Sequence, residues 1–181
     1  MRQMVQNPGF GLETKFVAMG DLAEVTDGRI HGYASLFGEA DQNGDVVMPG
    51  AFAASLAALA RAGRKVKFLW QHDPTCPIGV WSEVAEDGRG LLVTGEILAK
   101  VSHGTDALAL LEAGAIDGLS IGYRTIRAEP NPETGGRNLH EIDLWEVSLV
   151  TFPMLPTARA MLGAVEPSDV MELALAEALS V

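Results

Sequence analysis

Runs of alternating apolar and polar residues recur along most of this chain, and each run ends at a glycine, a proline or a polar turn. Alternation with a period of two is typical of strands that bury one face. The pattern predicts seven strands, at residues 14–19, 29–37, 65–70, 78–85, 90–98, 119–126 and 139–150. The fourth and fifth strands flank the turn sequence at residues 86–89, so we expect them to form a hairpin.

Apolar residues recur at helical spacing in three other segments, which predict helices at residues 51–62, 105–113 and 168–179. Gly63 is expected to end the first helix, and Thr105 is expected to cap the second. In the third, Met171, Leu175 and Leu179 form an apolar stripe. Many short strands with a few interspersed helices favour a mainly β, α+β fold, in which a closed or nearly closed barrel has its helices packed outside.

Two segments between these elements are predicted to be irregular. Asn43-Gly44 is a strong turn signal. The acidic residues around it do not form a calcium loop of the EF-hand type, because Val46 and Phe52 stand where glycine and glutamate are required. Residues 129–138 are rich in proline and glycine, which predicts a loop.

The length of 181 residues suits one domain with a sizeable core. We expect that domain to span residues 1–166, with a loose arm at 1–12. Residues 167–181 are expected to form an amphipathic helix or tail, whose apolar stripe could dock on the domain.

The charge balance narrows the classes of partner. Acidic residues number 24 against 13 basic, which gives a net charge of -11. Such a surface argues against non-specific binding to nucleic acid or to an anionic membrane, and it is compatible with a basic protein partner. The chain has a single cysteine, no apolar signal core at its start and no apolar run long enough to span a bilayer, so we expect it to be cytoplasmic.

Ser120 lies in an apolar run between two glycines, Gly118 and Gly122. Glycine within a strand often marks a place where a ligand or another backbone comes close. Because glycines have no side chains, the space around the Ser120 hydroxyl is uncrowded, which suits a nucleophile that must approach a peptide carbonyl. The alternative is a core strand whose glycines admit a neighbouring side chain, and the motif alone does not decide between them.

A serine nucleophile needs a base within hydrogen-bond reach and a group that orients the base. Among four histidines, His72 continues an apolar row on its strand to a loop edge, where Asp73-Pro74 is expected to break the strand. The alternative is a surface histidine at a strand end. Glu146 lies in the middle of an apolar strand, so it either points to solvent or has a partner such as a histidine.

Other uses of these residues have less support. His72, Asp73 and Cys76 are close in sequence, but no second pair of ligands accompanies them, so we expect no metal and no cofactor. A Cys76 nucleophile lacks a flanking signature, and no phosphate-binding glycine loop is present.

Taken together, the motifs resemble the prohead (capsid maturation) serine proteases of HK97-type tailed phages and phage-derived particles such as gene transfer agents. The resemblance runs from about residue 29 to residue 160. The motifs that carry it are, in order, GYASLF, DQNGDVVMPGAF, WQHD, IGVW, EDGRGLLVTGEI, LEAGAIDGLSIGYR and LWEVSLVTFPMLPTA. That family is similar in fold to the herpesvirus assembly protease, which implies a β-barrel surrounded by helices.

The resemblance also implies roles for individual residues. Ser120 matches the nucleophile and His72 the general base. The herpesvirus site has a histidine as its third member, on the strand after the nucleophile strand, and here Glu146 is the residue able to serve. His140 is the alternate third member, and Arg159 is a candidate oxyanion donor.

By resemblance, the expected activity is that of a serine endopeptidase that trims the N-terminal scaffolding segment from the major capsid protein inside the prohead. The chain itself is a second expected substrate. Besides docking on the domain, residues 167–181 are then candidates for a self-cleaved tail or an encapsidation signal. A homodimer is expected because related barrels act as dimers. Two rival functions stay open. One is an assembly chaperone with the protease fold that binds capsid protein without cutting it, and the other is a β-barrel binding module without a capsid role.

Overall fold

The structure is a computed structural model, and it describes residues 13–17, 28–152, 155, 157 and 159–163. Three predicted features lie outside the described residues: the arm at 1–12, the tail from 167 onward and the helix at 168–179. In the described part, no helix is long and apolar enough to cross a membrane.

The seven predicted strands all correspond to strands of the structure, and the first two predicted helices are present. The elements in chain order are β1 (Glu13–Val17), β2 (Arg29–Leu36), β3 (Val46–Val47), α1 (Ala53–Arg61), β4 (Lys67–Trp70), β5 (Asp73–Glu86), β6 (Gly90–Ile97), α2 (Ser102–Glu112), β7 (Gly118–Pro130), β8 (Arg137–Val150) and β9 (Ala160–Leu162). The fold is therefore α+β and consists mostly of strands, as the alternation predicts.

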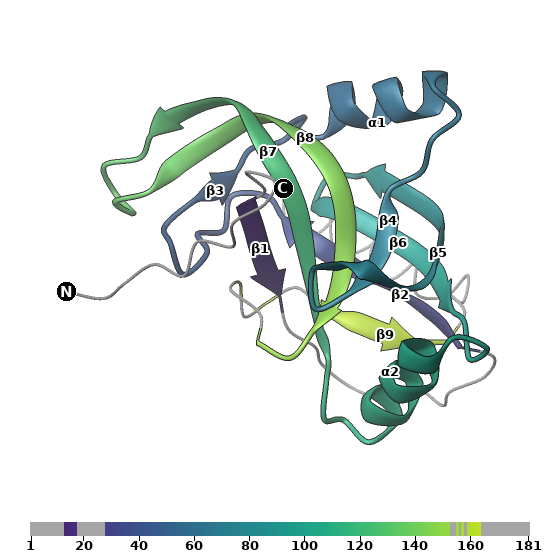
Figure 1. Ribbon diagram of the computed structural model, residues 1–181. Helices are drawn as coiled ribbons and strands as arrows, with labels where there is room; N and C mark the ends of the chain where they lie inside the picture. The colour runs from purple at the N-terminus through teal and green to yellow at the C-terminus, as the bar shows by residue number, and fades with distance from the viewer. Residues whose placement is uncertain (1–12, 18–27, 153–154, 156, 158, 164–181) are drawn as a thin grey trace.

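One nine-stranded sheet contains all the strands, in the order β1-β7-β8-β4-β5-β6-β2-β9, with β3 paired to β8 beside this path. β7 and β8 form a long, curved antiparallel hairpin (Figure 1). β4 lies parallel to β8, and its pairing begins where Lys67 faces Glu146. The helices lie at opposite ends of the sheet in this view, with α1 near β8 and α2 near β9 (Figure 1).

The prediction of a closed barrel is wrong, because the sheet formed by the described residues does not close on itself. β1 occupies the free edge of β7, where Glu13–Val17 pairs with Leu119–Tyr123. The opposite end of the sheet is β9. Among the described residues, an isolated bridge between Arg159 and Gly118 is the only backbone pairing that joins this end to β7. A closed barrel needs a continuous ladder between its two end strands, and no such ladder joins β9 to β1 or β7 in the described part of the chain.

The core lies between the sheet and the helices, and it depends on two glycines beside large rings. The rings of Phe68 and Trp81 stack with centroids 3.9 Å apart. A Cβ atom on Gly79 would lie 2.6 Å from the Phe68 ring, and one on Gly95 would lie 2.5 Å from the Trp81 ring. These two glycines therefore make the room that the aromatic pair fills.

Two local predictions need correction. The predicted loop at 129–138 is shorter, because β7 runs to Pro130 and β8 starts at Arg137. Asn131 organises the remaining turn, since its side-chain oxygen accepts from the backbone N–H of Glu133. Thr105 does not cap α2, because the helix begins at Ser102 and the Thr105 hydroxyl instead donates to the carbonyl of Ala99.

Asp45 and Arg137 tie the 41–45 turn to the start of β8. The guanidinium of Arg137 donates to both carboxylate oxygens of Asp45, whose side chain is only 8% exposed. We expect Arg137→Ala to lower the free energy of unfolding by about 2 kcal/mol, because it leaves a nearly buried carboxylate without this partner. Urea denaturation measures this. The control is Arg124→Ala, which removes an exposed pair with Asp143 and should cost less than about 1 kcal/mol.

Candidate active site

Ser120 lies on β7, between β1 on one side and β8 on the other. It faces Ser148 across the antiparallel β7–β8 pair, and Gly122 faces Glu146 two residues further along. Directly opposed residues in such a pair project to the same face of the sheet. The alternation of side chains therefore brings Ser120, Ser148 and Glu146 to one face.

His72 belongs to a two-residue turn that joins β4 to β5. Trp70 and Asp73 pair on either side of it, and Gln71 and His72 both have positive φ, 51° and 61°. Two consecutive residues with positive φ are typical of a type I′ hairpin turn. The strand ends before Asp73-Pro74, as predicted, but the next strand starts earlier than predicted, because Asp73 is already the first residue of β5.

Non-glycine residues adopt this conformation only where the surroundings hold them in it. Here β8 holds the turn, since the backbone N–H of Gln71 donates to the carbonyl of Leu149 at 3.0 Å. The side chain of Gln71 also donates to the hydroxyl of Thr151, at 2.6 Å. The backbone N–H of His72 donates to Ser148 Oγ at 3.1 Å. These bonds fix His72 above the face that carries Ser120.

The three residues identified from the sequence form a continuous hydrogen-bonded line. Ser120 Oγ lies 2.6 Å from His72 Nε2, and His72 Nδ1 lies 2.6 Å from Glu146 Oε1. An ionised carboxylate only accepts hydrogen bonds. Nδ1 of His72 therefore carries a proton and donates it in a hydrogen bond to Glu146. Nε2 of the neutral ring can then accept the hydroxyl proton of Ser120.

Glu146 is 4% exposed, and burial of a carboxylate is costly unless hydrogen bonds compensate for the lost water. His72 supplies one such bond. The hydroxyl of Ser148 supplies another, donating to Oε2 at 2.5 Å. Ser148 thus contacts the carboxylate with its proton and the His72 backbone with its oxygen.

Gly122 is the position that makes room for this carboxylate. A Cβ atom there would lie 2.0 Å from Glu146 Oε1 and 2.7 Å from its carboxyl carbon. The glycine on this side of Ser120 therefore admits a neighbouring side chain, which is one of the two alternatives that the sequence left open. The side chain admitted is the one that contacts His72.

The other candidates lie apart from this line. His140 Nε2 is 3.5 Å from Glu129, near the far end of the β7–β8 hairpin. The guanidinium of Arg159 donates to Asp117 at 3.3 Å, and its backbone bridges to Gly118. An oxyanion role for Arg159 stays a prediction. Unchanged turnover in an Arg159→Ala variant would rule it out.

The segment after His72 has its own hydrogen bonds. Two hydrogen bonds from Thr75 lower the pKa of the Asp73 carboxyl below its usual value. The larger contribution comes from the Thr75 hydroxyl and the smaller one from its backbone N–H. Cys76 Sγ also lies 3.5 Å from this carboxylate. Among the described residues, no three His, Cys, Asp or Glu side chains form a group able to hold a metal ion.

The sequence did not single out Ser148. The signal that was available is its parity on β8, where it shares a face with Glu146. Its contact with the turn at His72 has no signature in the sequence, because Gln71-His72 lacks the Asn-Gly or Asp-Gly typical of such turns.

Comparison with known proteins places the chain in a family. The profile of the caudovirus prohead serine proteases matches residues 17–171. The prohead protease of Enterobacteria phage HK97 is 34% identical over 84% of this chain, and that of Escherichia phage T5 is 29% identical over 69% of it. The chain spans 66% and 58% of the lengths of these two relatives.

A solved structure agrees at the level of the fold. The capsid assembly protease of bacteriophage T4 superposes with a TM-score of 0.56 at 13% identity, over 84% of this chain and 99% of that one. The family profile covers most of the chain, including every residue of the hydrogen-bonded line. The chain therefore belongs to the caudovirus prohead serine protease family.

Proposed function

We propose that this chain is a serine endopeptidase in which Ser120 is the nucleophile, His72 is the general base and Glu146 orients the histidine. The observation that carries the proposal is the line from Ser120 Oγ through both ring nitrogens to Glu146, with each contact at 2.6 Å. This geometry activates a hydroxyl and fixes the imidazole tautomer. Family membership supports peptide-bond hydrolysis as the reaction.

In the first step, Ser120 Oγ attacks the carbonyl carbon of the scissile bond while its proton moves to Nε2 of His72. The imidazolium that forms carries a proton on each nitrogen and stays paired with Glu146. The C–N bond of the tetrahedral intermediate then breaks. Nε2 returns its proton to the departing amine, which leaves an acyl ester on Ser120.

In the second step, a water molecule attacks the acyl ester. Nε2 of His72 takes a proton from the water and passes it to Ser120 Oγ as the ester bond breaks. A new carboxyl terminus is released, and the serine is restored. The same three residues thus act in both halves of the reaction.

Ser120 is fully buried in this chain. A peptide carbonyl therefore reaches its hydroxyl only when neighbouring chain segments move aside. We propose that this opening accompanies binding of the substrate segment, so that cleavage is fastest within the particle.

We propose the major capsid protein as the substrate, cut near its N-terminus to remove a scaffolding segment, and this chain itself as a second substrate. The relatives from phages HK97 and T5 are named prohead proteases, and the T4 structure is that of a capsid assembly protease. Covalent removal of a scaffolding segment makes assembly irreversible, which binding alone does not.

Ser148 is proposed to position Glu146, and this predicts a graded loss of rate. Ser148→Ala removes the bond to Glu146 Oε2, so we expect kcat to fall by about 10- to 100-fold with little change in KM. Ser148→Cys, with a weaker donor, should give an intermediate rate. Cleavage kinetics on a capsid-derived peptide measure both variants.

Ser55→Ala is the matched control for Ser148. Ser55 is also a buried serine, and its hydroxyl accepts from the backbone of Leu144. Its loss should lower stability and leave kcat within about twofold of wild type. Equal kcat losses in Ser148→Ala and Ser55→Ala would show that Ser148 affects the rate only through the stability of the fold.

The proposed function is tested by co-expressing this chain with the major capsid protein encoded in the same genome. Intact-mass analysis of the capsid product then shows whether it has been cut. We expect a shortened capsid protein with wild type and a full-length one with Ser120→Ala. A full-length product in both, with assembly still dependent on this chain, would instead establish the non-catalytic chaperone.

A further inference from the structure

A groove of about 260 Å³ lies between α1 and β5, on elements that do not carry the proposed active-site residues. Its floor is apolar and includes Leu56 and Leu59 of α1 and Val84 of β5. Trp81 also lines it. The indole N–H of Trp81 is buried and has no hydrogen-bond partner among the described residues. The groove therefore has an apolar floor next to an unused donor.

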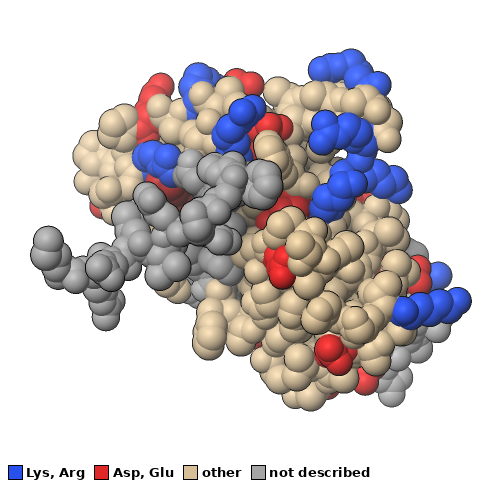
Figure 2. Space-filling model, viewed as in Figure 1, with Lys and Arg blue, Asp and Glu red and all other residues tan. Residues whose placement is uncertain are grey.

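The rim of this groove is basic, although the chain as a whole is acidic. Four of its 13 Lys and Arg residues lie within 61–67, namely Arg61, Arg64, Lys65 and Lys67. Arg64 and Lys65 line the groove. Figure 2 shows Lys and Arg side chains gathered on this side of the molecule, over α1 and β4. Among the described residues, none of the four forms an ion pair, so the cations face solvent.

The segment after β9 has the complementary character. Residues 164–181 contain four acidic residues and neither Lys nor Arg. Met171, Leu175 and Leu179 recur at helical spacing, and Glu172 lies about 60° from the centre of this stripe on a helical wheel. An acidic amphipathic helix matches an apolar groove with a basic rim.

The sheet register brings this segment within reach. Leu162 of β9 pairs with Ile30, Ile30 with Gly95, and Gly95 with Trp81, so three strand spacings separate β9 from the groove. At about 4.8 Å per spacing this is about 14 Å. Residues 163–167 span up to about 17 Å when extended, which lets a helix that begins at Ser168 start beside Trp81.

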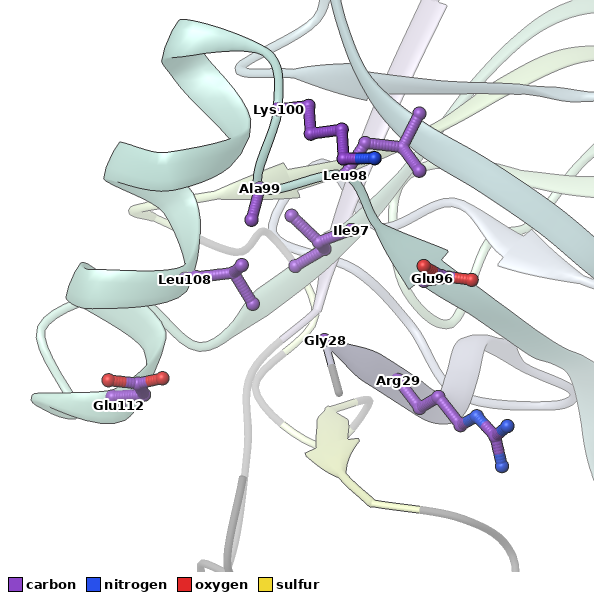
Figure 3. A pocket seen from close by; sticks show the side chains of 9 residues that line it. All are labelled: Gly28, Arg29, Glu96, Ile97, Leu98, Ala99, Lys100, Leu108 and Glu112. Atoms are coloured by element: carbon purple, nitrogen blue, oxygen red, sulfur yellow. The ribbon is translucent and has the colours of Figure 1, made fainter. Parts of the chain in front are cut away.

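A second, larger pocket among the described residues does not offer the same match. It measures about 700 Å³ and lies between α2 and the ends of β2 and β6. Figure 3 shows Leu108 of α2 pointing towards Ile97, with charged side chains at the edges. Those side chains are two cations, Arg29 and Lys100, and two anions, Glu96 and Glu112. Such a balanced rim does not select an acidic segment.

From these observations we propose that residues 168–179 form a helix that docks in the α1–β5 groove of the same chain. The apolar stripe covers Leu56, Leu59 and Val84, and Glu172 lies towards Arg64 and Lys65. This docking is independent of catalysis.

Hydrogen exchange of the full-length chain, read by mass spectrometry, tests the docking. We expect the amides of 168–179 to be protected in wild type, at a level that does not depend on protein concentration. Reversing the charge of the groove rim with Arg64→Glu and Lys65→Glu should speed the exchange of these tail amides by about tenfold or more. Adding Asp169→Lys and Glu172→Lys to that variant should restore the protection.

Two controls keep the result specific. Lys100→Glu with Arg127→Glu changes the net charge equally at exposed positions away from the groove, and it should leave the tail protected. Leu175→Asp should abolish protection of the tail while the exchange of β7 and β8 stays as in wild type. Unprotected tail amides in wild type, equal loss in both charge reversals, or protection that rises with concentration would overturn the proposal.

Discussion

Ser120→Ala and His72→Ala are each expected to abolish processing of the capsid protein, with a rate loss of about 10⁶-fold. The first removes the atom that forms the acyl ester, and the second removes the base whose Nε2 lies 2.6 Å from that hydroxyl. The two residues act in the same step, so the double variant should be no slower than either single one. A time course of capsid cleavage after co-expression measures all three.

Two control variants match these changes at positions outside the site. Ser82 is an exposed serine whose hydroxyl donates to the Thr94 carbonyl, and His103 is an exposed histidine on α2. Ser82→Ala and His103→Ala should cleave at the wild-type rate. Full activity of Ser120→Ala beside these controls would remove the serine mechanism.

Glu146→Gln is expected to reduce kcat by about 10⁴-fold, the second largest effect. The glutamine amide can donate to Nδ1, which favours the tautomer with its proton on Nε2, where it blocks acceptance from Ser120. Glu83→Gln, on the exposed side of β5, is the matched control and should be silent.

Gly122→Ala tests the same carboxylate without changing its chemistry. The added methyl group would overlap Glu146 Oε1, so the carboxylate must leave its place beside His72. We expect a kcat loss that approaches that of Glu146→Gln, with the sheet still folded. Wild-type kcat in Gly122→Ala would show that the position of Glu146 does not matter for the rate.

The residues of the candidate site could be proposed from the sequence because each lies in an interpretable setting and matches a motif that resembles the family. Ser120 is flanked by glycines, Glu146 is a charge within an apolar strand, and His72 ends an apolar row. The geometry that joins them was not accessible. It depends on the strained Gln71-His72 turn and on Ser148, and both owe their positions to the parallel pairing of β4 with β8. Such pairing between distant segments leaves no local pattern.

The error about the barrel has a related cause. Alternation identifies strands and their buried faces, but it does not say which strand occupies a given edge. β1 ends the sheet beside β7 and β9 ends it beside β2, and no ladder joins these two ends among the described residues, which leaves the sheet open. The long β7–β8 hairpin was underestimated for a local reason. Pro130 suggested a loop, although it closes the strand at a position where pairing still continues.

The most direct test of the central claim combines labelling with cleavage in one preparation. Particles that contain this chain and the capsid protein are treated with a fluorophosphonate, and both proteins are analysed by mass spectrometry while cleavage is followed. We expect a single adduct, on Ser120, whose formation parallels the loss of cleavage activity. We expect no adduct in His72→Ala. A preparation that cleaves its capsid protein while Ser120 stays unmodified, or one that is labelled and still cleaves at full rate, would contradict the central claim.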